Sequence, residues 1–367
     1  MLTVSRPVHD CCLLRTRAPV PPFSHPLPPH APPTHPPPPP QVTLHYLQKM
    51  VGKGTVLHPV VEGLRKAVIE GGGWTADHLA EMQGIADTGG FALEDIQYAN
   101  LFYEFGTLGI DAAVSGVKTP SWKMCTSIVA QDNDGHILHA RNQDYSLPGL
   151  VNITVQAQFT RAGKVVYAGN TFAGYIGLPT ALRPGGWSVS CDSRFNGGGV
   201  NLLENIKVAK AGAKTIGIMV RDALESAETY SDMLHVLNTT AVIAPAYYIV
   251  AGTKAGEGAV VTRNRDGPDN SHDNEGIWQI GDGTPSPSKK YGDWWRLETN
   301  WDHWEPLTDG RRGHANKAME ALGQANVNFG TLTTLLSTKP VLASDTVYTA
   351  KMSPLLGTYE TIVRPGY

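Results

Sequence analysis

The chain has 367 residues, of which 41% are hydrophobic and 17% charged, and 30 Lys and Arg against 33 Asp and Glu give a net charge of −3. This balance is typical of a globular protein with roughly two domains or one large one, and it excludes a small scaffold held together by disulfides or a metal. A protein that binds nucleic acid through charge normally has a basic excess, so we expect no nucleic-acid partner. No window reaches the roughly 18 uninterrupted apolar residues that span a bilayer.

Residues 1–41 differ in composition from the rest of the chain. They hold about half of the 27 prolines, ending in a run at 36–40, and little that can form a core. We expect a disordered or polyproline II segment, which is an SH3-type ligand, a linker or the product of a mispredicted first exon. A secretory leader is not expected, because Arg6, His9 and Asp10 interrupt the start of the chain.

Residues 42–109 have the periodicity of helices. Apolar residues recur three or four positions apart, first around Leu64 and then around Met82, and glycines separate the segments. Thr75 is placed to cap the second of these helices. A polar stretch follows before the pattern changes, so residues 42–124 are predicted to form a helical region.

A β-hairpin is predicted next. Residues 126–131 and 136–140 are rich in β-forming residues, and Asp-Asn-Asp-Gly at 132–135 is a strong turn signal. If the turn centres on residues 133–134, the numbers of paired residues sum to about 267.

That register predicts a cluster of reactive side chains at one end of the hairpin. Cys125 lies opposite Asn142, with Arg141 and Asp144 close by. A thiol, a guanidinium and a carboxylate would therefore share one strand end. The simpler alternative is that Arg141 and Asp144 form a surface ion pair and that Cys125 is a buried apolar residue.

Strands and helices alternate in the rest of the chain. Strands are expected at residues 151–159, 165–172, 187–191, 247–251, 259–263, 276–280, 294–300, 346–352 and 358–363. Helices are expected at residues 215–227 and 230–237 and as a pair over 314–337. This order indicates an α+β fold in which helices cover antiparallel sheets.

No metal site is predicted. The cysteines are too few and too unevenly spaced for a zinc site or a disulfide framework: Cys11, Cys12, Cys125 and Cys191. Cys191 is expected to be a packed thiol. His136 and His139 fall on opposite faces of a strand, and the turn at 132–135 is too short for a calcium loop.

The sequence around Cys125 resembles a known family. Cys-Thr-Ser-Ile-Val-Ala-Gln-Asp at 125–132, with Gly-His at 135–136 and His-Ala-Arg-Asn-Gln-Asp-Tyr at 139–145, is similar to the characteristic block of the acid ceramidase and N-acylethanolamine-hydrolyzing acid amidase family. Four further segments resemble the family, in family order: residues 170–178, 247–252, 261–268 and 298–304. The last two are closer to the N-acylethanolamine amidase branch, while residues 337–342 resemble the ceramidase branch as well.

The resemblance implies an N-terminal nucleophile hydrolase with an αββα sandwich, made as a precursor that cuts itself between Met124 and Cys125. Residues 42–124 would become the α-subunit and residues 125–367 the catalytic β-subunit, held together noncovalently. The implied reaction splits N-acylethanolamines into fatty acid and ethanolamine through an acyl-thioester, with no metal or organic cofactor. An acid ceramidase that releases sphingosine is the alternative within the family, and an inactive lipid-binding relative is the alternative from another class.

The residue types around Cys125 fit this chemistry. A thiol is largely protonated at acidic pH, so a cysteine hydrolase needs a base and positive surroundings. Cleavage would supply the α-amine of Cys125 as the base, whose ordinary pKa is about 7.7 to 8.0. Arg141 would lower the pKa of that amine and stabilise the thiolate, and Asp144 would orient the amine.

Two further site residues come from the resemblance. Asn300 would donate to the oxyanion, and Arg311 would position Asn300 or the substrate carbonyl, although the neighbouring Arg312 can take this role instead; a strand end is the simpler interpretation of Asn300. The chain departs from the family at Pro179, where the amidase branch has tryptophan, and at Ser193, where the family has glutamate. These departures bear on acyl-chain preference and on full activity.

The family also implies a lysosomal glycoprotein. Asn152 and Asn238 begin sequons that are glycosylated only in the secretory pathway. Because the substrate is amphiphilic, we expect peripheral contact with membranes through apolar faces of the α-region.

Overall fold

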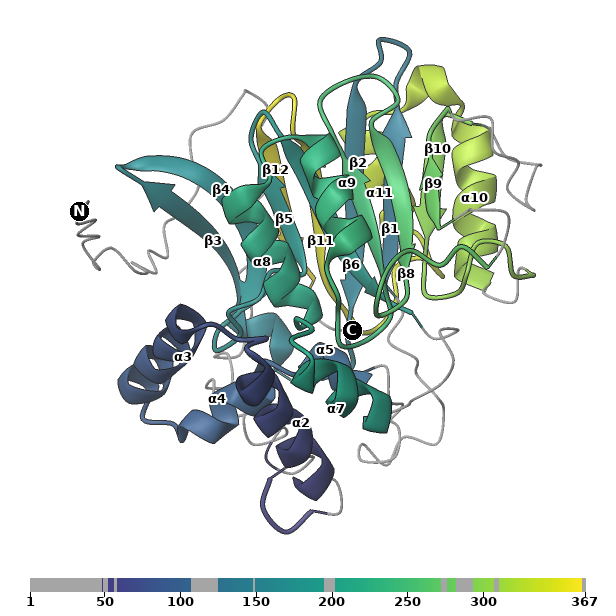
Figure 1. Cartoon of the computed structure of the whole chain (residues 1–367). Coiled ribbons are helices and arrows are strands. Elements are labelled where there is room, and N and C mark those ends of the chain that lie inside the picture. Colours follow the sequence, from purple (N-terminus) through teal and green to yellow (C-terminus); the bar gives the residue numbers. More distant parts are fainter. Residues whose placement is uncertain are drawn as a thin grey trace.

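The computed structural model describes residues 48, 52–55, 58–106, 125–147, 149–194, 202–271, 276–281, 293–306 and 310–364. In these residues, a layered body of two sheets and flanking helices lies against a group of helices from the N-terminal part of the chain (Figure 1). The Pro-rich segment, Cys11, Cys12 and Met124 lie outside the described residues.

The strands form two antiparallel sheets. They are β1 (Thr126–Gln131), β2 (Ile137–Asp144), β3 (Thr154–Arg161), β4 (Lys164–Phe172), β5 (Thr180–Arg183), β6 (Trp187–Ser193), β7 (Ala246–Ala251), β8 (Gly258–Arg263), β9 (Ile277–Gln279), β10 (Trp295–Glu298), β11 (Thr346–Ser353) and β12 (Thr358–Val363). The five-stranded sheet has the order β10-β1-β2-β11-β12, and the seven-stranded sheet runs from β3 to β9 in chain order.

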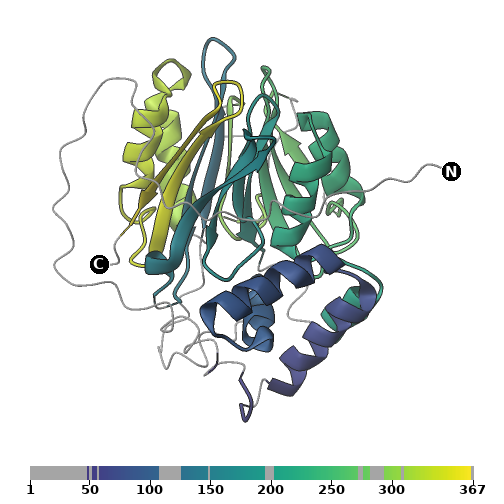
Figure 2. The ribbon, with the colours of Figure 1, turned by 90° about the vertical axis from the view of Figure 1, so that its left-hand side faces the viewer.

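Helices cover the outer face of each sheet. The described helices are α2 (His58–Gly71), α3 (Ala76–Gly89), α4 (Leu93–Ala99), α5 (Phe102–Gly106), α7 (Leu202–Lys210), α8 (Ile216–Ser226), α9 (Tyr230–Thr239), α10 (Gly310–Leu322) and α11 (Phe329–Leu336), with short 3-10 helices at Leu150–Ile153 and Gln324–Asn326. Figure 2 shows α10 and α11 on one side of the sheets and α8 and α9 on the other. The predicted αββα sandwich is therefore confirmed.

The alternation of side chains along the strands builds these layers. On β1, Ile128 and Ala130 pack in the cluster that contains residues of α10 and α11, whereas Val129 packs in the cluster between the sheets with Tyr247 and Ile249 of β7. Successive side chains of a strand point to opposite faces, so a strand covered on both sides is buried throughout. β2 is buried at every position.

The predicted helical region contains α2 to α5. Thr75 caps α3 as predicted: its side chain accepts a hydrogen bond from the backbone N–H of His78, and the His78 side chain accepts one from the Thr75 N–H. Apolar residues of α2, α3 and α4 form a separate core cluster that includes Leu64, Met82 and Ile96. α7 joins this cluster through Ala209.

The observed elements differ from the predicted ones in several places. Residues 151–153, predicted as the start of a strand, belong to a 3-10 helix, so β3 begins at Thr154. β5 and α7 are not predicted, because a four-residue strand has too little periodicity and because α7 packs on α2, which is far away in sequence. The strand expected at 294–300 ends at Glu298, so Asn300 lies in the following connection.

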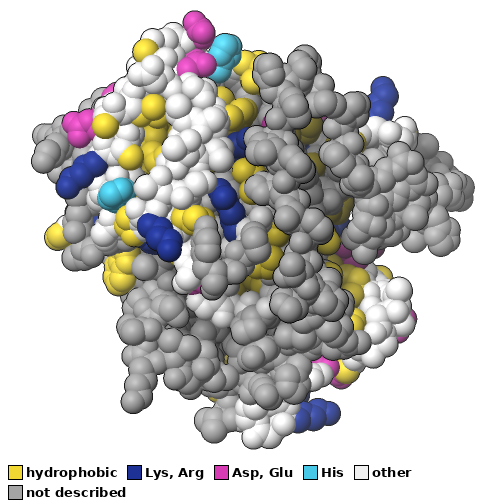
Figure 3. Space-filling view, turned by 180° about the vertical axis from the view of Figure 1, so that it is seen from behind, with side chains coloured by type: hydrophobic (Ala, Val, Ile, Leu, Met, Phe, Trp, Pro, Cys, Tyr) yellow, Lys and Arg dark blue, Asp and Glu magenta, His cyan; other side chains and the backbone are white. Residues whose placement is uncertain are grey.

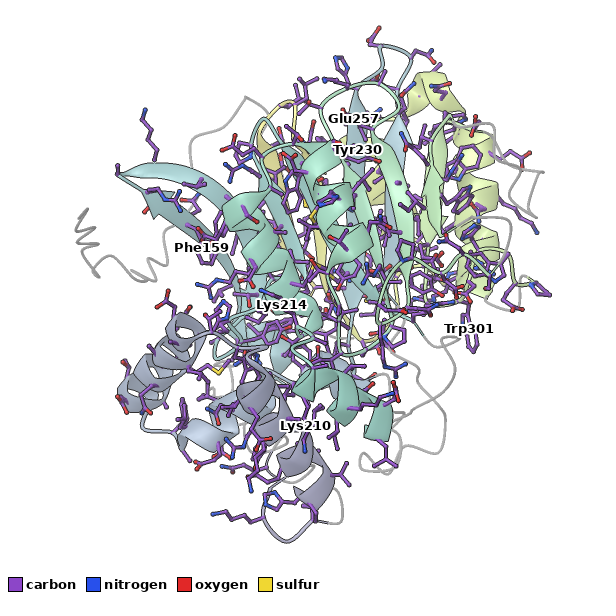
Figure 4. All side chains as sticks on the ribbon, in the orientation of Figure 1. Phe159, Lys210, Lys214, Tyr230, Glu257 and Trp301 are labelled. Atoms are coloured by element: carbon purple, nitrogen blue, oxygen red, sulfur yellow. The ribbon has the colours of Figure 1, made fainter. Side chains whose placement is uncertain are left out.

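The surface of the described residues has mixed character. Lys and Arg side chains lie among acidic and apolar ones on the face shown in Figure 3. Tyr230, at the start of α9, and Glu257, between β7 and β8, lie at the end of the seven-stranded sheet that is remote from the helical region (Figure 4). None of the described helices combines the length and apolar character that crossing a bilayer requires.

The core cluster formed by α2, α3 and α4 predicts the effect of a mutation in α2. Leu64 is 0% exposed, so Leu64→Ala should destabilise the protein by about 2 to 5 kcal/mol through lost burial and a cavity. Leu203→Ala on the adjacent α7 is a matched control, because Leu203 is 80% exposed and should cost less than about 1 kcal/mol. Urea unfolding of both variants gives the comparison, and an equal loss in the two would contradict the described packing.

Candidate active site

The β1–β2 hairpin positions the predicted nucleophile, with a register that differs from the predicted one. Thr126 pairs with Asn142 and Ser127 with Arg141, so the numbers of paired residues sum to 268. Cys125, directly before β1, therefore lies opposite Gln143, and the prediction that it faces Asn142 is wrong by one residue.

The turn explains this difference. The connection is not a two-residue turn but the five residues between Gln131 and Ile137. Asp132 holds it closed, since its carboxylate accepts hydrogen bonds from the backbone N–H groups of Asp134 (2.9 Å) and His136 (2.8 Å). Gly135 has a φ of 84°, in the left-handed region that favours glycine.

The thiol of Cys125 is buried at the strand end. The residue is 3% exposed, and its Sγ lies 3.6 Å from Nε2 of Gln143 and 3.9 Å from the carbonyl oxygen of Asp144. Burial raises the pKa of the thiol to about 12, while the positive charge of Arg141 acts in the opposite direction. In the intact chain this thiol is therefore overwhelmingly protonated.

Arg141 lies between the two sheets with no exposed surface. Its Nη1 donates to the carbonyl of Pro179 (3.0 Å) and to the hydroxyl of Thr180 (3.0 Å), and its Nη2 lies 3.2 Å from Oδ1 of Asp192. Arg141 is thus held by residues of the opposite sheet. Neither its Nε nor its Nη2 makes a hydrogen bond within the described part of the chain.

Asp144 lies at the same strand end but on the other face of the sheet, because residues three apart on a strand face opposite sides. Its Oδ2 accepts from Nη1 of Arg311 (3.1 Å) and its Oδ1 from the hydroxyl of Thr346 (2.6 Å). Burial raises the pKa of Asp144 to about 7, and Arg311 opposes the rise. Arg141 and Asp144 are both fully buried and have different ionic partners, so they are not a surface ion pair.

Arg311 connects the other predicted residues. Besides Asp144, it approaches the hydroxyl of Thr126 (3.5 Å) and Oδ1 of Asn300 (3.4 Å). Asn300 in turn donates from Nδ2 to the carbonyl of Ser193 (2.7 Å). Arg312 points elsewhere, to the carbonyls of Trp301 and Asp302. The structure therefore brings Arg311, and not Arg312, to Asn300.

The departure at Ser193 leaves this contact in place, because Asn300 uses the backbone carbonyl of Ser193 and not its side chain. The adjacent Arg194 is held separately, by Asp302 (2.6 Å) and Asp269 (2.5 Å). At the other departure, the Pro179 carbonyl accepts from Arg141 and from the backbone N–H of Cys191.

Three buried residues near the thiol were not found from the sequence: Asp192, Gln143 and Tyr103. Asp192 faces Arg141 across the space between the sheets and accepts a hydrogen bond from Ser127 (2.9 Å). The available signal for Asp192 was its position directly after the predicted strand at 187–191, since a carboxylate that is buried there requires a partner. Nothing in the local pattern marks Gln143 or Tyr103.

A cavity of about 390 Å³ lies beside the strand ends of β2 and β11. Its lining residues belong to the segment that follows β2 and to the segment that leads into β11: Tyr145, Ser146, Leu147, Gly149, Val151, Asn152, Ser344, Asp345, Thr346 and Val347. Thr346, which donates to Asp144, belongs to this wall. The cavity thus adjoins the carboxylate side of the site.

The histidines have separate environments. His136 Nδ1 lies 3.0 Å from the Asp132 carboxylate in the turn, whereas His139 is fully buried between the hydroxyls of Ser188 and Ser190, each 2.9 Å away. Within the described ranges, one group of potential metal ligands lies close together, Asp132, Asp134 and His136, and its Asp132 carboxylate already closes the turn. Cys191 is a buried free thiol.

Comparisons with known proteins agree with this geometry. The sequence model of the linear amide C–N hydrolases, choloylglycine hydrolase family, matches residues 125–333 and so begins at Cys125. An acid ceramidase of Heterocephalus glaber is 36% identical over 311 residues, covering 80% of this chain and 71% of the relative. An N-acylethanolamine-hydrolyzing acid amidase of Cavia porcellus is 39% identical over 277 residues, covering 74% of this chain and 69% of the relative.

A solved structure extends the likeness to the fold. The Caenorhabditis elegans N-acylethanolamine-hydrolyzing acid amidase ortholog superposes with a TM-score of 0.57 at 34% identity, covering 66% of this chain and 100% of that chain. The chain therefore belongs to the linear amide C–N hydrolases of the choloylglycine hydrolase family, among relatives that include acid ceramidases and N-acylethanolamine-hydrolyzing acid amidases, and is a hydrolase of amide bonds.

Proposed function

We propose that this protein hydrolyses N-acylethanolamines to fatty acid and ethanolamine, and that it becomes active when the chain is cut between Met124 and Cys125. The observation that carries the proposal is the position of Cys125. Its thiol lies at the start of a buried strand, beside a guanidinium that is held in the interior, and the family match begins at the same residue.

The division into subunits fits the comparisons. The solved relative's chain matches 66% of this chain, which is the share that residues 125–367 make up. Residues 42–124 would form the α-subunit and residues 125–367 the β-subunit.

Contacts between the described parts of these subunits support a noncovalent heterodimer. Arg221 of α8 lies 2.7 Å from Glu81 of α3, and Asp222 of α8 lies 3.2 Å from His78 and also pairs with Lys214, which Figure 4 labels.

Cleavage would create the missing base. In the intact chain the thiol has a pKa of about 12 and forms little thiolate near neutral pH. A new α-amine on Cys125 can accept the thiol proton, because its ordinary pKa is about 7.7 to 8.0. Arg141 lowers the pKa of that amine and stabilises the thiolate. The intact chain is then an inactive precursor.

The reaction proceeds in two steps. The Cys125 sulfur attacks the amide carbon, a C–S bond forms, and the carbonyl oxygen becomes an oxyanion. The C–N bond then breaks, the ethanolamine nitrogen takes the proton from the α-amine, and the acyl group remains as a thioester. Water attacks the thioester carbon and loses a proton to the α-amine. The C–S bond then breaks, the sulfur takes that proton back, and the fatty acid leaves.

Asn300 is the proposed oxyanion donor. Its amide has two N–H hydrogens, of which one is bonded to the Ser193 carbonyl, and the second is left for the substrate. Arg311 fixes the orientation of Asn300 through Oδ1 and joins it to Asp144. Losing one oxyanion donor commonly costs about 100- to 1,000-fold in rate. Asp144, which adjoins Thr126 through Arg311, orients the new terminus.

The amidase branch is preferred over ceramidase for the substrate. The segments at 261–268 and 298–304 resemble that branch, and the amidase of Cavia porcellus has 39% identity against 36% for the ceramidase of Heterocephalus glaber. An acid ceramidase remains the alternative activity.

An acidic, lysosomal location fits the chemistry of the interior. Burial raises the pKa of Glu298 to about 8, so this carboxyl is neutral at acidic pH. The sequons at Asn152 and Asn238 are exposed and accessible to a glycan. Membrane contact through α2 to α5 has less support, because the large apolar side chains that the described residues expose lie elsewhere: Val165, Leu203, Leu355, Leu356 and Val363.

The cleavage is tested by intact mass. Purified wild-type chain, incubated at mildly acidic pH, should give two fragments that meet at Met124 and Cys125, and Cys125→Ala should stay whole. Cys191→Ala is the matched control: it removes the other buried free thiol of the described residues and should be cut like wild type. A wild-type chain that stays whole, or a cut elsewhere, would sink the proposed activation.

The same preparation decides the substrate. Cut enzyme should hydrolyse a fatty-acid ethanolamide at least about 10-fold faster, in kcat/KM, than a ceramide with the same acyl chain, a difference of about 1.4 kcal/mol in transition-state stabilisation. The reverse order identifies a ceramidase. Binding of both lipids without hydrolysis by cut enzyme identifies a binding protein.

The buried carboxyl of Glu298 also predicts how stability depends on pH. Glu298 has a folded pKa of about 8, above the ordinary value near 4 that applies in the unfolded chain. The folded state therefore binds more protons, and stability falls as pH rises through this range. His139, whose pKa burial lowers to about 3, acts in the opposite direction only below its ordinary value of about 6.5.

The free energy of unfolding should therefore fall between about pH 6.5 and pH 8 by up to about 1.4 kcal/mol per pH unit for each retained proton. Glu298→Gln should flatten this slope, while Glu320→Gln, at an exposed position of α10, should not. Urea titrations at several pH values measure the slope. Stability that rises over this range would contradict the assignment.

A further inference from the structure

Gln143 touches the proposed nucleophile and has no role in the reaction described above. It is fully buried on β2, and its Nε2 donates to the Cys125 sulfur at 3.6 Å. Cys125, Gln143 and Tyr348 form a row across three neighbouring strand ends, since Gln143 pairs with Tyr348 of β11 and lies opposite Cys125. A neutral amide donor thus faces the sulfur from the adjacent strand.

The orientation of this amide is determined by its other contacts. Oε1 of Gln143 accepts from the hydroxyl of Tyr103 (2.9 Å) and from that of Tyr348 (3.5 Å). Because hydroxyl donors face Oε1, the NH2 group has to face the sulfur.

A directed chain of donors leads from Arg141 to the same amide. Arg141 donates to the Thr180 hydroxyl (3.0 Å), which lies 2.8 Å from the Tyr348 hydroxyl. Since Tyr348 donates to Gln143, the hydrogen between Thr180 and Tyr348 belongs to Thr180. Each member therefore donates to the next, and Gln143 donates last, to the sulfur. Such chains polarise their members and strengthen the terminal bond.

The shortest of the contacts on Gln143 comes from the helical region. Tyr103 belongs to α5, and it is 1% exposed. Its ring lies in an aromatic cluster with Phe102, Tyr145 and Tyr175, with centroids 4.7 to 6.2 Å from that of Tyr103. Two rings of this cluster come from α5 and two from the body, so the position of Tyr103 depends on the docking of α5.

We propose that Gln143 is a further catalytic residue, a donor that stabilises the Cys125 thiolate, and that Tyr103 of the α-region is the positioning residue that keeps its amide facing the sulfur. This inference rests on the proposed function, in which Cys125 is the nucleophile. On this proposal the α-region has to stay bound after the chain is cut, because it holds Tyr103. A hydrogen bond to a charged group changes an equilibrium by about 10-fold or more.

The test compares three variants of the cut enzyme. Gln143→Met keeps the length of the side chain and removes the donor, and Tyr103→Phe removes a single hydroxyl. Tyr175→Phe is the matched control, because its ring packs against that of Tyr103 while its hydroxyl faces the backbone of Gly217 and not Gln143. The first readout is the rate of Cys125 alkylation by iodoacetamide as a function of pH, assigned to Cys125 by peptide mass. The second is kcat and KM for a fatty-acid ethanolamide.

Gln143→Met should move the alkylation profile up by about one pH unit and lower kcat about 10-fold with KM little changed, because the thiolate loses a donor. Tyr103→Phe should act in the same direction by about 3-fold, and the double variant should be no worse than Gln143→Met, because the tyrosine acts through the amide. Tyr175→Phe should match wild type. A Gln143→Met profile and kcat within twofold of wild type, or penalties that multiply in the double variant, would overturn the inference.

Alkylation needs no substrate, so the two proposals fail separately. If the profile shifts in Gln143→Met while wild type hydrolyses no lipid amide, the role of Gln143 stands and the proposed substrate is wrong. If wild type hydrolyses the ethanolamide and the profile does not shift, the function stands and the role of Gln143 is wrong. Tyr103→Phe keeps the test decisive if Gln143→Met does not fold.

Discussion

A guanidinium without any contact with water lies between the two sheets, and the arrangement of the site follows from the need to compensate its charge. Arg141 is carried by the five-stranded sheet, while Thr180 and Asp192, which hold it, belong to the seven-stranded sheet. An isolated buried charge costs several kcal/mol, and removing one partner of a buried ion pair commonly costs about 3 to 5 kcal/mol. A shift of one sheet relative to the other would separate Arg141 from these partners and leave its charge buried and uncompensated. The Cys125 thiol therefore lies near a positive charge whose position is fixed.

The alternation of side chains along β2 divides the site between the two faces of the five-stranded sheet. Arg141, Gln143 and the Cys125 thiol lie on the face of the five-stranded sheet that is turned toward the seven-stranded sheet. Asp144 and Arg311 lie on the opposite face, which α10 covers. Arg311 contacts Thr126 on this side and also Asn300, which donates to the carbonyl of Ser193 at the end of β6 in the seven-stranded sheet. Thr126, which follows the proposed nucleophile, and the proposed oxyanion donor Asn300 are thereby held by one side chain.

The helical region is part of this arrangement. Glu104 of α5 accepts a hydrogen bond from the backbone N–H of Ile216 (2.8 Å), the first residue of α8. Thr215, the N-cap residue of α8, makes no side-chain capping bond, so Glu104 supplies a contact that the local sequence does not. With Tyr103 next to it, α5 contributes both to the stability of the body and to the wall of the site.

Much of this organisation could be predicted from the sequence. The capping of α3, the positions of most strands and the αββα layers follow from local patterns and from the family block around Cys125. The hairpin register could not be predicted to one residue, because Asp132 closes a five-residue connection with hydrogen bonds that a turn signature alone does not reveal.

That single residue matters, because side chains alternate along a strand: it is Gln143, and not Asn142, that faces the thiol. Asp192 and Tyr103 could not be predicted either. Their partners, Arg141 and Gln143, lie about 40 to 50 residues away in the sequence, in other elements. Such pairings depend on how the layers stack, which periodicity does not encode.

In the proposed reaction the sulfur of Cys125 carries the acyl group during turnover, and trapping that intermediate is the most direct test. Enzyme mixed with a long-chain ethanolamide and quenched in acid within the first turnover should yield a peptide that starts at Cys125 and carries the acyl mass. Neutral hydroxylamine should remove this mass, as it does from a thioester. An acyl group on another residue, on an uncut chain, or on no residue while fatty acid is still released would contradict the account.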